Sequence, residues 1–242
     1  MRLGSVLPIL FALAVLSACA STPQTPPPIS TPPLAQTPPA RFADEIAAFQ
    51  AADAAQPPPA CQTLFVGSSS IRRWTSLAQD FPNLPVLNRG FGGSTTAEAN
   101  AYFDRIVAPY APRAIVFYEG ENDIDDGMTT DAVFAEFQHF LALKTAALGD
   151  TPVYFISVKP SILRWSQFAA QTALNARVRA LADQRADLVY VDIVPAMLEN
   201  GAPKPIFVAD NLHMTTAGYA LWTPIVAAAL AAPAPTHAPH CS

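Results

Sequence analysis

The sequence has little positive charge. Lys and Arg together number 14 among 242 residues, the formal net charge at pH 7 is −5, and no segment concentrates the basic side chains. Proteins that bind nucleic acid need a basic surface, because contacts to phosphate supply much of their affinity. We therefore expect no nucleic-acid partner.

Histidine and cysteine, the common ligands of zinc, are also scarce, with 4 His and 3 Cys in the chain. His139 lies in a helical pattern, and His237 and His240 stand in the C-terminal tail, where HAPHC is a poor ligand set. The sequence therefore predicts no metal site. His213 is the histidine best placed for chemistry.

Apolar runs long enough to span a membrane are absent as well. The stretch 6–16 is too short to cross a bilayer and is typical of the apolar region of a secretory signal. The residues Leu-Ser-Ala-Cys at 16–19 resemble the bacterial lipobox, in which the cysteine is lipidated. This resemblance implies a lipid anchor at Cys19, and Ala20 after it implies the outer membrane. Ordinary secretory cleavage nearby is the alternative.

Proline is plentiful, and its distribution marks the organisation of the chain. Eight of the 25 prolines fall between residues 20 and 40 among small and polar residues, which predict a semi-extended tether. We therefore expect a signal segment, a Pro-rich tether, an N-terminal helix with its connector, a folded domain and a Pro-rich tail, at 1–18, 19–40, 41–59, 60–232 and 233–242.

Between the proline-rich ends, short apolar runs alternate with helical patterns. The expected strands are 64–66, 86–88, 114–118, 153–157 and 188–191, and the expected helices are 41–56, 71–79, 95–107, 131–148, 167–184 and 216–230. Parallel strands joined by crossover helices form one sheet that is covered on both faces. The pattern predicts an α/β fold, a three-layer αβα sandwich with a five-stranded parallel sheet.

The stretch 64–74, LFVGSSSIRRW, places three serines directly after the first expected strand. Open α/β sheets bind ligands beyond the carboxyl ends of their strands, so Ser69 is a candidate nucleophile. On its own, this pattern is more typical of an ordinary turn and helix cap.

Two further loops follow strands in the same way. The turn 88–96, NRGFGGSTT, can bring backbone N–H groups near a ligand, but it lacks the lysine of a phosphate loop and the spacing of a dinucleotide fingerprint. Asn122, after the third strand, can offer its amide to an oxyanion. A tight turn and a capping asparagine are the alternatives.

A carboxylate and an imidazole stand close together near the C-terminal end. Asp210 precedes His213 by three residues. At this spacing the carboxylate can hold Nδ1 of the imidazole, so that Nε2 faces a nucleophile as a general base.

The blocks GSSS, GFGGS, GEND and DNLH come in the order and at the strand ends typical of SGNH or GDSL-type hydrolases, which the chain resembles from about 64 to 230. This resemblance implies a flavodoxin-like fold. It also implies the catalytic residues Ser69, Asp210 and His213 and the oxyanion donors Ser69, Gly93 and Asn122.

The nucleophile block departs from the family pattern at one position, because Ser68 stands where the family usually has Asp. Alignment of the glycine with Gly67 selects Ser69 among the three adjacent serines. An α/β-hydrolase is a rival interpretation, but Ile71 occupies the position of the second glycine in its GxSxG motif.

By the resemblance, the chain is a serine ester hydrolase with a small ester substrate and without a cofactor. We expect it to be lipid-anchored on the periplasmic face of the envelope and to act on short-chain acyl esters, with acetylated envelope carbohydrate as a candidate. An O-acyltransferase with the same triad and a non-catalytic glycan-binding lipoprotein are the alternatives. The sequence does not define the oligomeric state.

Lipidation of Cys19 would leave Cys61 and Cys241. In an oxidising periplasm these two can form a disulfide that ties the tail to the first strand, and two free thiols are the alternative. Arg164 and Trp165 follow the fourth strand, where they can line the pocket and contact a sugar or an acyl group.

Overall fold

The computed structural model describes residues 1, 40–233 and 236–241. Cys19 and the segments expected to be the signal and the tether lie outside the described residues, apart from Met1 and Ala40. Among the described residues, no helix has the length and apolar character to cross a membrane, and no group of three or more His, Cys, Asp or Glu side chains is arranged to hold a metal ion.

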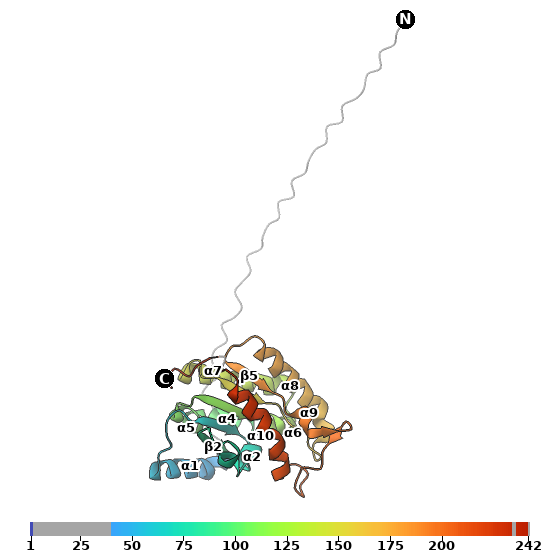
Figure 1. Cartoon of the computed structure of the whole chain (residues 1–242). Helices are drawn as coiled ribbons and strands as arrows, with labels where there is room; N and C mark the ends of the chain where they lie inside the picture. The colour runs from blue at the N-terminus through green and yellow to red at the C-terminus, as the bar shows by residue number, and fades with distance from the viewer. Residues whose placement is uncertain (2–39, 234–235, 242) are drawn as a thin grey trace. The chain divides into compact units, whose positions relative to one another are not determined.

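A five-stranded parallel sheet forms the centre of the folded unit (Figure 1). Its strands are β1 (Thr63–Gly67), β2 (Val86–Gly90), β3 (Ala114–Tyr118), β4 (Val153–Ile156) and β5 (Leu188–Val191). Their order across the sheet is β2-β1-β3-β4-β5, the order of flavodoxin-like doubly wound folds. The predicted α/β sandwich is confirmed, and the predicted strands differ from the observed ones only at their ends.

Helices cover both faces of this sheet. The main ones are η1 (Ala40–Phe42), α1 (Ala43–Ala55), α2 (Ser69–Arg72), α3 (Leu77–Asp80), α4 (Thr96–Ala101), α5 (Phe103–Ile106), α7 (Thr130–Leu148), α8 (Phe168–Ala182) and α10 (Thr216–Ala231). The sequence pattern does not predict the short elements α6 (Glu121–Asp125), α9 (Val194–Met197), β6 (Leu198–Glu199) and β7 (Ala202–Pro203).

Two of the predicted helices are each divided in two. The predicted helix 71–79 contains the end of α2 and the start of α3, and between them the Trp74 ring is buried in the core with its Nε1 donating to Asp80 at 2.6 Å. The predicted helix 95–107 is interrupted at Tyr102, which lies between α4 and α5. Periodicity alone does not reveal these breaks, because both halves keep apolar residues on the core side.

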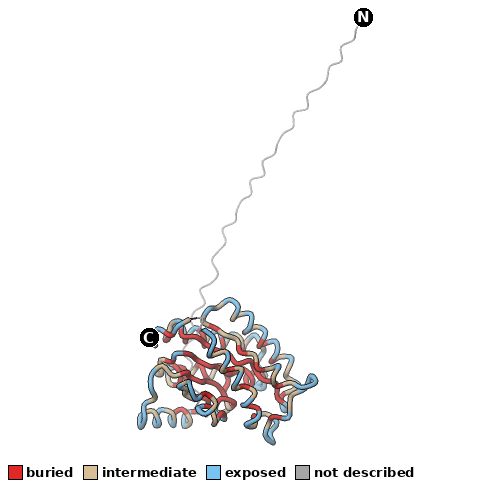
Figure 2. Tube along the Cα trace, in the orientation of Figure 1, coloured by how far each residue is buried: buried red, intermediate tan, exposed pale blue. Residues whose placement is uncertain are grey.

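The core lies in two layers, because side chains alternate between the two faces along each strand. On β1, Leu64 and Val66 pack on the face covered by α1, α4, α5, α7 and α8, whereas Phe65 packs on the opposite face with α2, α3 and α10. The inner strands β1, β3 and β4 are buried throughout, the edge strands β2 and β5 are partly buried, and the helices are exposed on their outer sides (Figure 2). The sheet is therefore packed on both faces, and the loops extend from its two ends.

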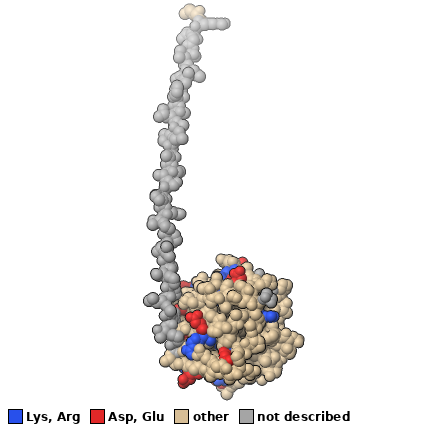
Figure 3. Space-filling model, turned by 90° about the vertical axis from the view of Figure 1, so that its left-hand side faces the viewer, with Lys and Arg blue, Asp and Glu red and all other residues tan. Residues whose placement is uncertain are grey.

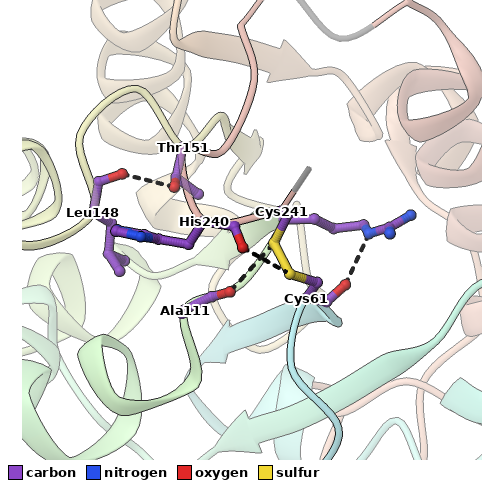
Figure 4. The surroundings of a disulfide bond; sticks show 7 residues. Cys61, Ala111, Leu148, Thr151, His240 and Cys241 are labelled. Carbon is purple, nitrogen blue, oxygen red and sulfur yellow. Dashed lines mark hydrogen bonds between the residues drawn. A yellow bond between two sulfur atoms is a disulfide. The ribbon is translucent and has the colours of Figure 1, made fainter.

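Cys61 and Cys241 form a disulfide (Figure 4). Their Cα atoms are 5.6 Å apart, and 180 positions separate them along the chain. The bond joins the C-terminal tail to the segment just before β1, and so lies at the amino-terminal edge of the sheet. The structure thereby decides between the two alternatives for these cysteines.

Charged side chains are sparse on the face of the molecule shown in Figure 3, and basic groups lie beside acidic ones there. The described residues contain several surface ion pairs, including Arg72 with Glu45 and Arg41 with Glu98. Pairs of this kind neutralise basic groups one by one, so that no extended basic patch forms on this face.

Candidate active site

Three loops begin side by side at the carboxyl end of the sheet. Gly67, at the end of β1, pairs with Gly90 of β2 on one side and with Tyr118 of β3 on the other. This is the point where the strand order reverses, and ligands of open α/β sheets bind there. The three loops carry Ser69, Gly93 and Asn122.

A sharp turn presents Ser69 at the start of α2, with Ser68 as the residue that precedes the helix. Gly67 permits this turn, because a Cβ atom at its position would lie 2.1 Å from the carbonyl oxygen of Tyr118. Ser68 and Ser70 are both buried, at 2% exposure, whereas Ser69 is half-buried. Ser69 is therefore the serine of the three that a substrate can reach.

His213 contacts both Ser69 and Asp210. Its Nε2 lies 2.8 Å from Ser69 Oγ, and its Nδ1 lies 2.7 Å from Asp210 Oδ2. When Nδ1–H donates to the carboxylate, Nε2 is free to accept the serine proton. The structure thus brings together the three residues predicted to form a triad, although 144 positions separate Ser69 from His213.

Local hydrogen bonds fix the loop that carries His213. Asp210 Oδ1 accepts from the backbone N–H groups of Leu212 and His213, each at 2.9 Å, and Leu163 N–H donates to Asn211 O at 3.0 Å. Burial acts to raise the pKa of Asp210, but the hydrogen bonds from His213 and Leu212 outweigh it and hold that pKa well below its usual range. The carboxylate therefore stays charged and can accept a hydrogen bond from His213 Nδ1–H.

Each of the three predicted oxyanion donors has an N–H hydrogen that is not used in a hydrogen bond among the described residues. As the first residue of α2, Ser69 has no acceptor for its N–H within the helix. Gly93 is exposed, with φ +74°, and its N–H has no acceptor among the described residues. Asn122 Nδ2 donates to Ser94 O at 2.8 Å, which leaves the second of its two hydrogens.

The model of the GDSL-like lipase/acylhydrolase family matches residues 59–221, more than half of the chain. The chain belongs to this family. A comparison with curated proteins finds no match.

Solved structures of other proteins share the fold of this family member. A GDSL-like lipase from Bacteroides thetaiotaomicron is 23% identical, with a TM-score of 0.62 over 78% of this chain and 95% of that one. A carbohydrate esterase of family 3 from Talaromyces cellulolyticus is 16% identical, with a TM-score of 0.57 over 71% and 96%. An acetyl esterase variant with an acetate ion is 17% identical, with a TM-score of 0.56 over 70% and 96%. At these identities the likeness concerns the fold.

In this GDSL-family chain, the structure defines the contacts of Arg164, for which a pocket-lining position was predicted. The side chain is buried, and its Nη1 donates to Asn122 Oδ1 at 2.9 Å while its Nη2 donates to Asp125 Oδ2 at 2.8 Å. Trp165 is half-buried and stacks on the Phe168 ring, with 4.6 Å between the centroids. Arg164 thus contacts the side chain of a predicted oxyanion donor.

A buried ionic network adjoins Asn122 through Arg164. Lys159 forms an ion pair with Glu121, and Tyr118 Oη donates to Glu121 Oε2 at 2.8 Å. Arg164 Nη1 lies 3.8 Å from Glu121 Oε1. Burial lowers the pKa of Lys159, while the attraction of Glu121 acts in the opposite direction. Loss of one partner would leave an uncompensated buried charge, so this network is costly to break.

Two buried carboxyl groups hold the residues that follow Gly93. Ser94 Oγ donates to Glu119 Oε1 at 2.5 Å, and Thr96 N–H donates to Asp123 Oδ1 at 2.9 Å. Burial raises the pKa of Glu119 well above its usual range, and the nearby charge of Asp123 adds to this effect. Burial likewise raises the pKa of Asp123 to about 6. These contacts attach the glycine-rich turn to the end of β3.

Sequence reasoning did not identify this supporting set of Arg164, Glu121, Lys159, Glu119 and Asp123. The sequence motifs mark the predicted nucleophile and oxyanion donors, which follow strand ends, and the predicted base, which stands three residues after a carboxylate. The supporting side chains come from different loops, and their pairing depends on which loops become neighbours. Adjacent acidic residues in GENDIDD, after a strand buried on both faces, were the available signal.

Proposed function

We propose that this family member is a serine ester hydrolase. Ser69 Oγ attacks the ester carbonyl carbon while His213 Nε2 takes its proton, and Asp210 orients the imidazole and stabilises its positive charge. The imidazolium then gives the proton to the leaving alkoxide, which yields an alcohol and an acyl ester on Ser69. Water activated by His213 hydrolyses this ester and releases the acid. The 2.8 Å contact between Ser69 Oγ and His213 Nε2 carries the proposal.

Three donors stabilise the oxyanion of the tetrahedral intermediate in this proposal. They are the backbone N–H groups of Ser69 and Gly93 and the free Nδ2–H of Asn122. Donors of this kind act on charge that develops only as the reaction proceeds, so they lower the barrier more than they strengthen substrate binding.

We propose short-chain acyl esters, including acetyl esters on envelope carbohydrate, as the substrate class. Two solved structures of the same fold are described as a carbohydrate esterase and an acetyl esterase, which supports this choice. A lipid anchor at Cys19, on the periplasmic side of the outer membrane, would place the enzyme beside such carbohydrate. Incorporation of a palmitate analogue that is lost in Cys19→Ser would test the anchor.

The activity is tested with p-nitrophenyl esters of increasing chain length, followed by acetylated glycans. We expect acetate and butyrate to be hydrolysed faster than octanoate, and Ser69→Ala to lower kcat by a factor of about 10³ or more. Ser70→Ala is the matched control, since Ser70 is buried beside the nucleophile and should leave kcat close to that of the natural chain. Near-normal hydrolysis by folded Ser69→Ala would remove Ser69 from the mechanism.

A fluorophosphonate probe separates catalysis from glycan binding. Only an activated serine reacts with it, so mass analysis should find the adduct on Ser69. A folded protein that binds acetylated glycans but neither reacts with the probe nor hydrolyses esters would be a binding protein. Transfer of the acyl group to an added sugar, in preference to water, would identify an acyltransferase.

A further inference from the structure

The N-terminal helical segment, η1 with α1, lies outside the part of the chain that matches the family model, which begins at residue 59. It nevertheless packs on the turn that carries Gly93. The buried ring of Phe42 contacts Phe91 edge to face, with 5.0 Å between the centroids, and Ile46 is fully buried in the same cluster. The N-terminal segment thus packs on Phe91, which lies two residues before the Gly93 donor.

Glu45 of this segment contacts two separate parts of the active site. Its Oε1 accepts a hydrogen bond from the backbone N–H of Gly92 at 2.6 Å, and its Oε2 pairs with Arg72 Nη1 at 2.6 Å. Gly92 directly precedes the Gly93 donor, and Arg72 is the last residue of α2, whose first residue is Ser69. One carboxylate therefore joins the two backbone segments that supply oxyanion N–H groups.

The packing between these segments is tight. A Cβ atom on Gly92 would lie 2.5 Å from Arg72 Cζ, so the guanidinium rests directly against the turn. Arg41 Nη2 also donates to Gly93 O at 3.3 Å. Contacts from the N-terminal segment thus hold the backbone on both sides of the Gly93 N–H group.

We propose that Glu45 is a positioning residue that fixes the Gly93 N–H group relative to Ser69. The proposal rests on the ester hydrolase function proposed above. An oxyanion donor works only at hydrogen-bond distance from the developing charge, and a displacement of about 1 Å can cost on the order of 100-fold in rate. Glu45 and Arg72 are partly exposed, so their ion pair contributes little to stability, and the variants should fold.

Three substitutions separate hydrogen-bond geometry from charge. Glu45→Ala removes the acceptor and should lower kcat for p-nitrophenyl acetate by about 10- to 100-fold, with KM changed by less than about threefold. Glu45→Asp keeps the charge but is one methylene too short for the Gly92 N–H, and should also lower kcat. Glu45→Gln keeps the acceptor for the Gly92 N–H but loses the acceptor for Arg72, so its kcat should fall less than that of Glu45→Ala, by up to about 10-fold.

Asp44 provides the matched control, because it is an exposed carboxylate on the same helix. Asp44→Ala should leave kcat and KM unchanged. A kcat of Glu45→Ala or Glu45→Asp within about threefold of the natural chain would overturn the proposal. So would a result in which Asp preserves kcat and Gln does not, since that order indicates a role for the charge alone.

The same assays distinguish failure of this proposal from failure of the function. If the natural chain neither hydrolyses the ester nor reacts with a fluorophosphonate, the proposed hydrolase function is wrong, and the role of Glu45 falls with it. If the natural chain does both, and the Glu45 variants match it, only the positioning role is wrong. Thermal unfolding of each variant, measured in parallel, identifies any that does not fold, and the remaining substitutions still decide.

Discussion

The guanidinium of Arg164 donates from Nη1 to Oδ1 of Asn122 at 2.9 Å, while Nδ2 of the same amide donates to Ser94 O at 2.8 Å. Arg164 can only donate and a carbonyl oxygen can only accept, so the two contacts define which end of the amide carries the nitrogen. The remaining Nδ2–H is therefore held in one orientation before any substrate binds. Preorganised donors of this kind are the ones that contribute most to catalysis.

Asn122→Ala should lower kcat by about 10² to 10³, because it removes one of three proposed oxyanion donors. KM should change much less, since the donor acts mainly on the transition state. Steady-state kinetics with p-nitrophenyl acetate measure both quantities. A loss of less than about threefold in kcat would give Asn122 a structural role.

Arg164→Met should lower kcat by about 10-fold, because it removes one of the two hydrogen bonds that orient the Asn122 amide while leaving the amide in place. The double variant with Asn122→Ala is the decisive comparison. If Arg164 acts through Asn122, the double variant should be no slower than Asn122→Ala alone. Losses that multiply independently would indicate a separate role for Arg164. Unfolding curves would show the effect of removing its positive charge from beside Glu121 and Asp125.

Asp123→Asn should make the free energy of unfolding less dependent on pH. Burial raises the pKa of Asp123 from 3.8 to about 6, so between these values the unfolded chain releases this proton and the folded chain keeps it. The contribution of Asp123 to the free energy of unfolding therefore falls as pH rises through this window, by about 3 kcal/mol at most. Above the window both states are ionised, and the folded state bears the full cost.

Asparagine can still accept the Thr96 N–H hydrogen bond without carrying a charge. We expect Asp123→Asn to be more stable than the natural chain at pH 8 and to lose most of this advantage near pH 4. Urea unfolding at the two pH values measures the difference. A difference in stability that is equal at both values would contradict the raised pKa.

Reduction of the Cys61–Cys241 disulfide should lower the free energy of unfolding by about 2 to 5 kcal/mol, because the bond closes a long loop in the unfolded chain. The double variant Cys61→Ser with Cys241→Ser should show the same loss and no further response to reductant. Ester hydrolysis at moderate temperature should be unchanged, since the disulfide lies at the opposite edge of the sheet from Ser69. Two alkylated thiols in the unreduced protein would contradict the bond.

The sequence determined the fold of this protein and the candidate residues of its site. Alternation of apolar strands with helical patterns dictated a parallel sheet, and the ends of the strands located Ser69, Gly93 and Asn122 at one edge of it. These features could be predicted from the sequence because strand burial and turn formation depend on a few neighbouring residues.

Only the tertiary structure decided which distant side chains hold these groups in place. Arg164 meets Asn122 and Glu45 meets Gly92 because separate loops and the N-terminal helix pack at the same edge, and no local pattern encodes that pairing. The same holds for the breaks in the predicted helices at Trp74 and Tyr102, where burial of a large ring overrides helical periodicity. The local sequence determines which chemical groups lie at the site, and tertiary packing determines the distances between them.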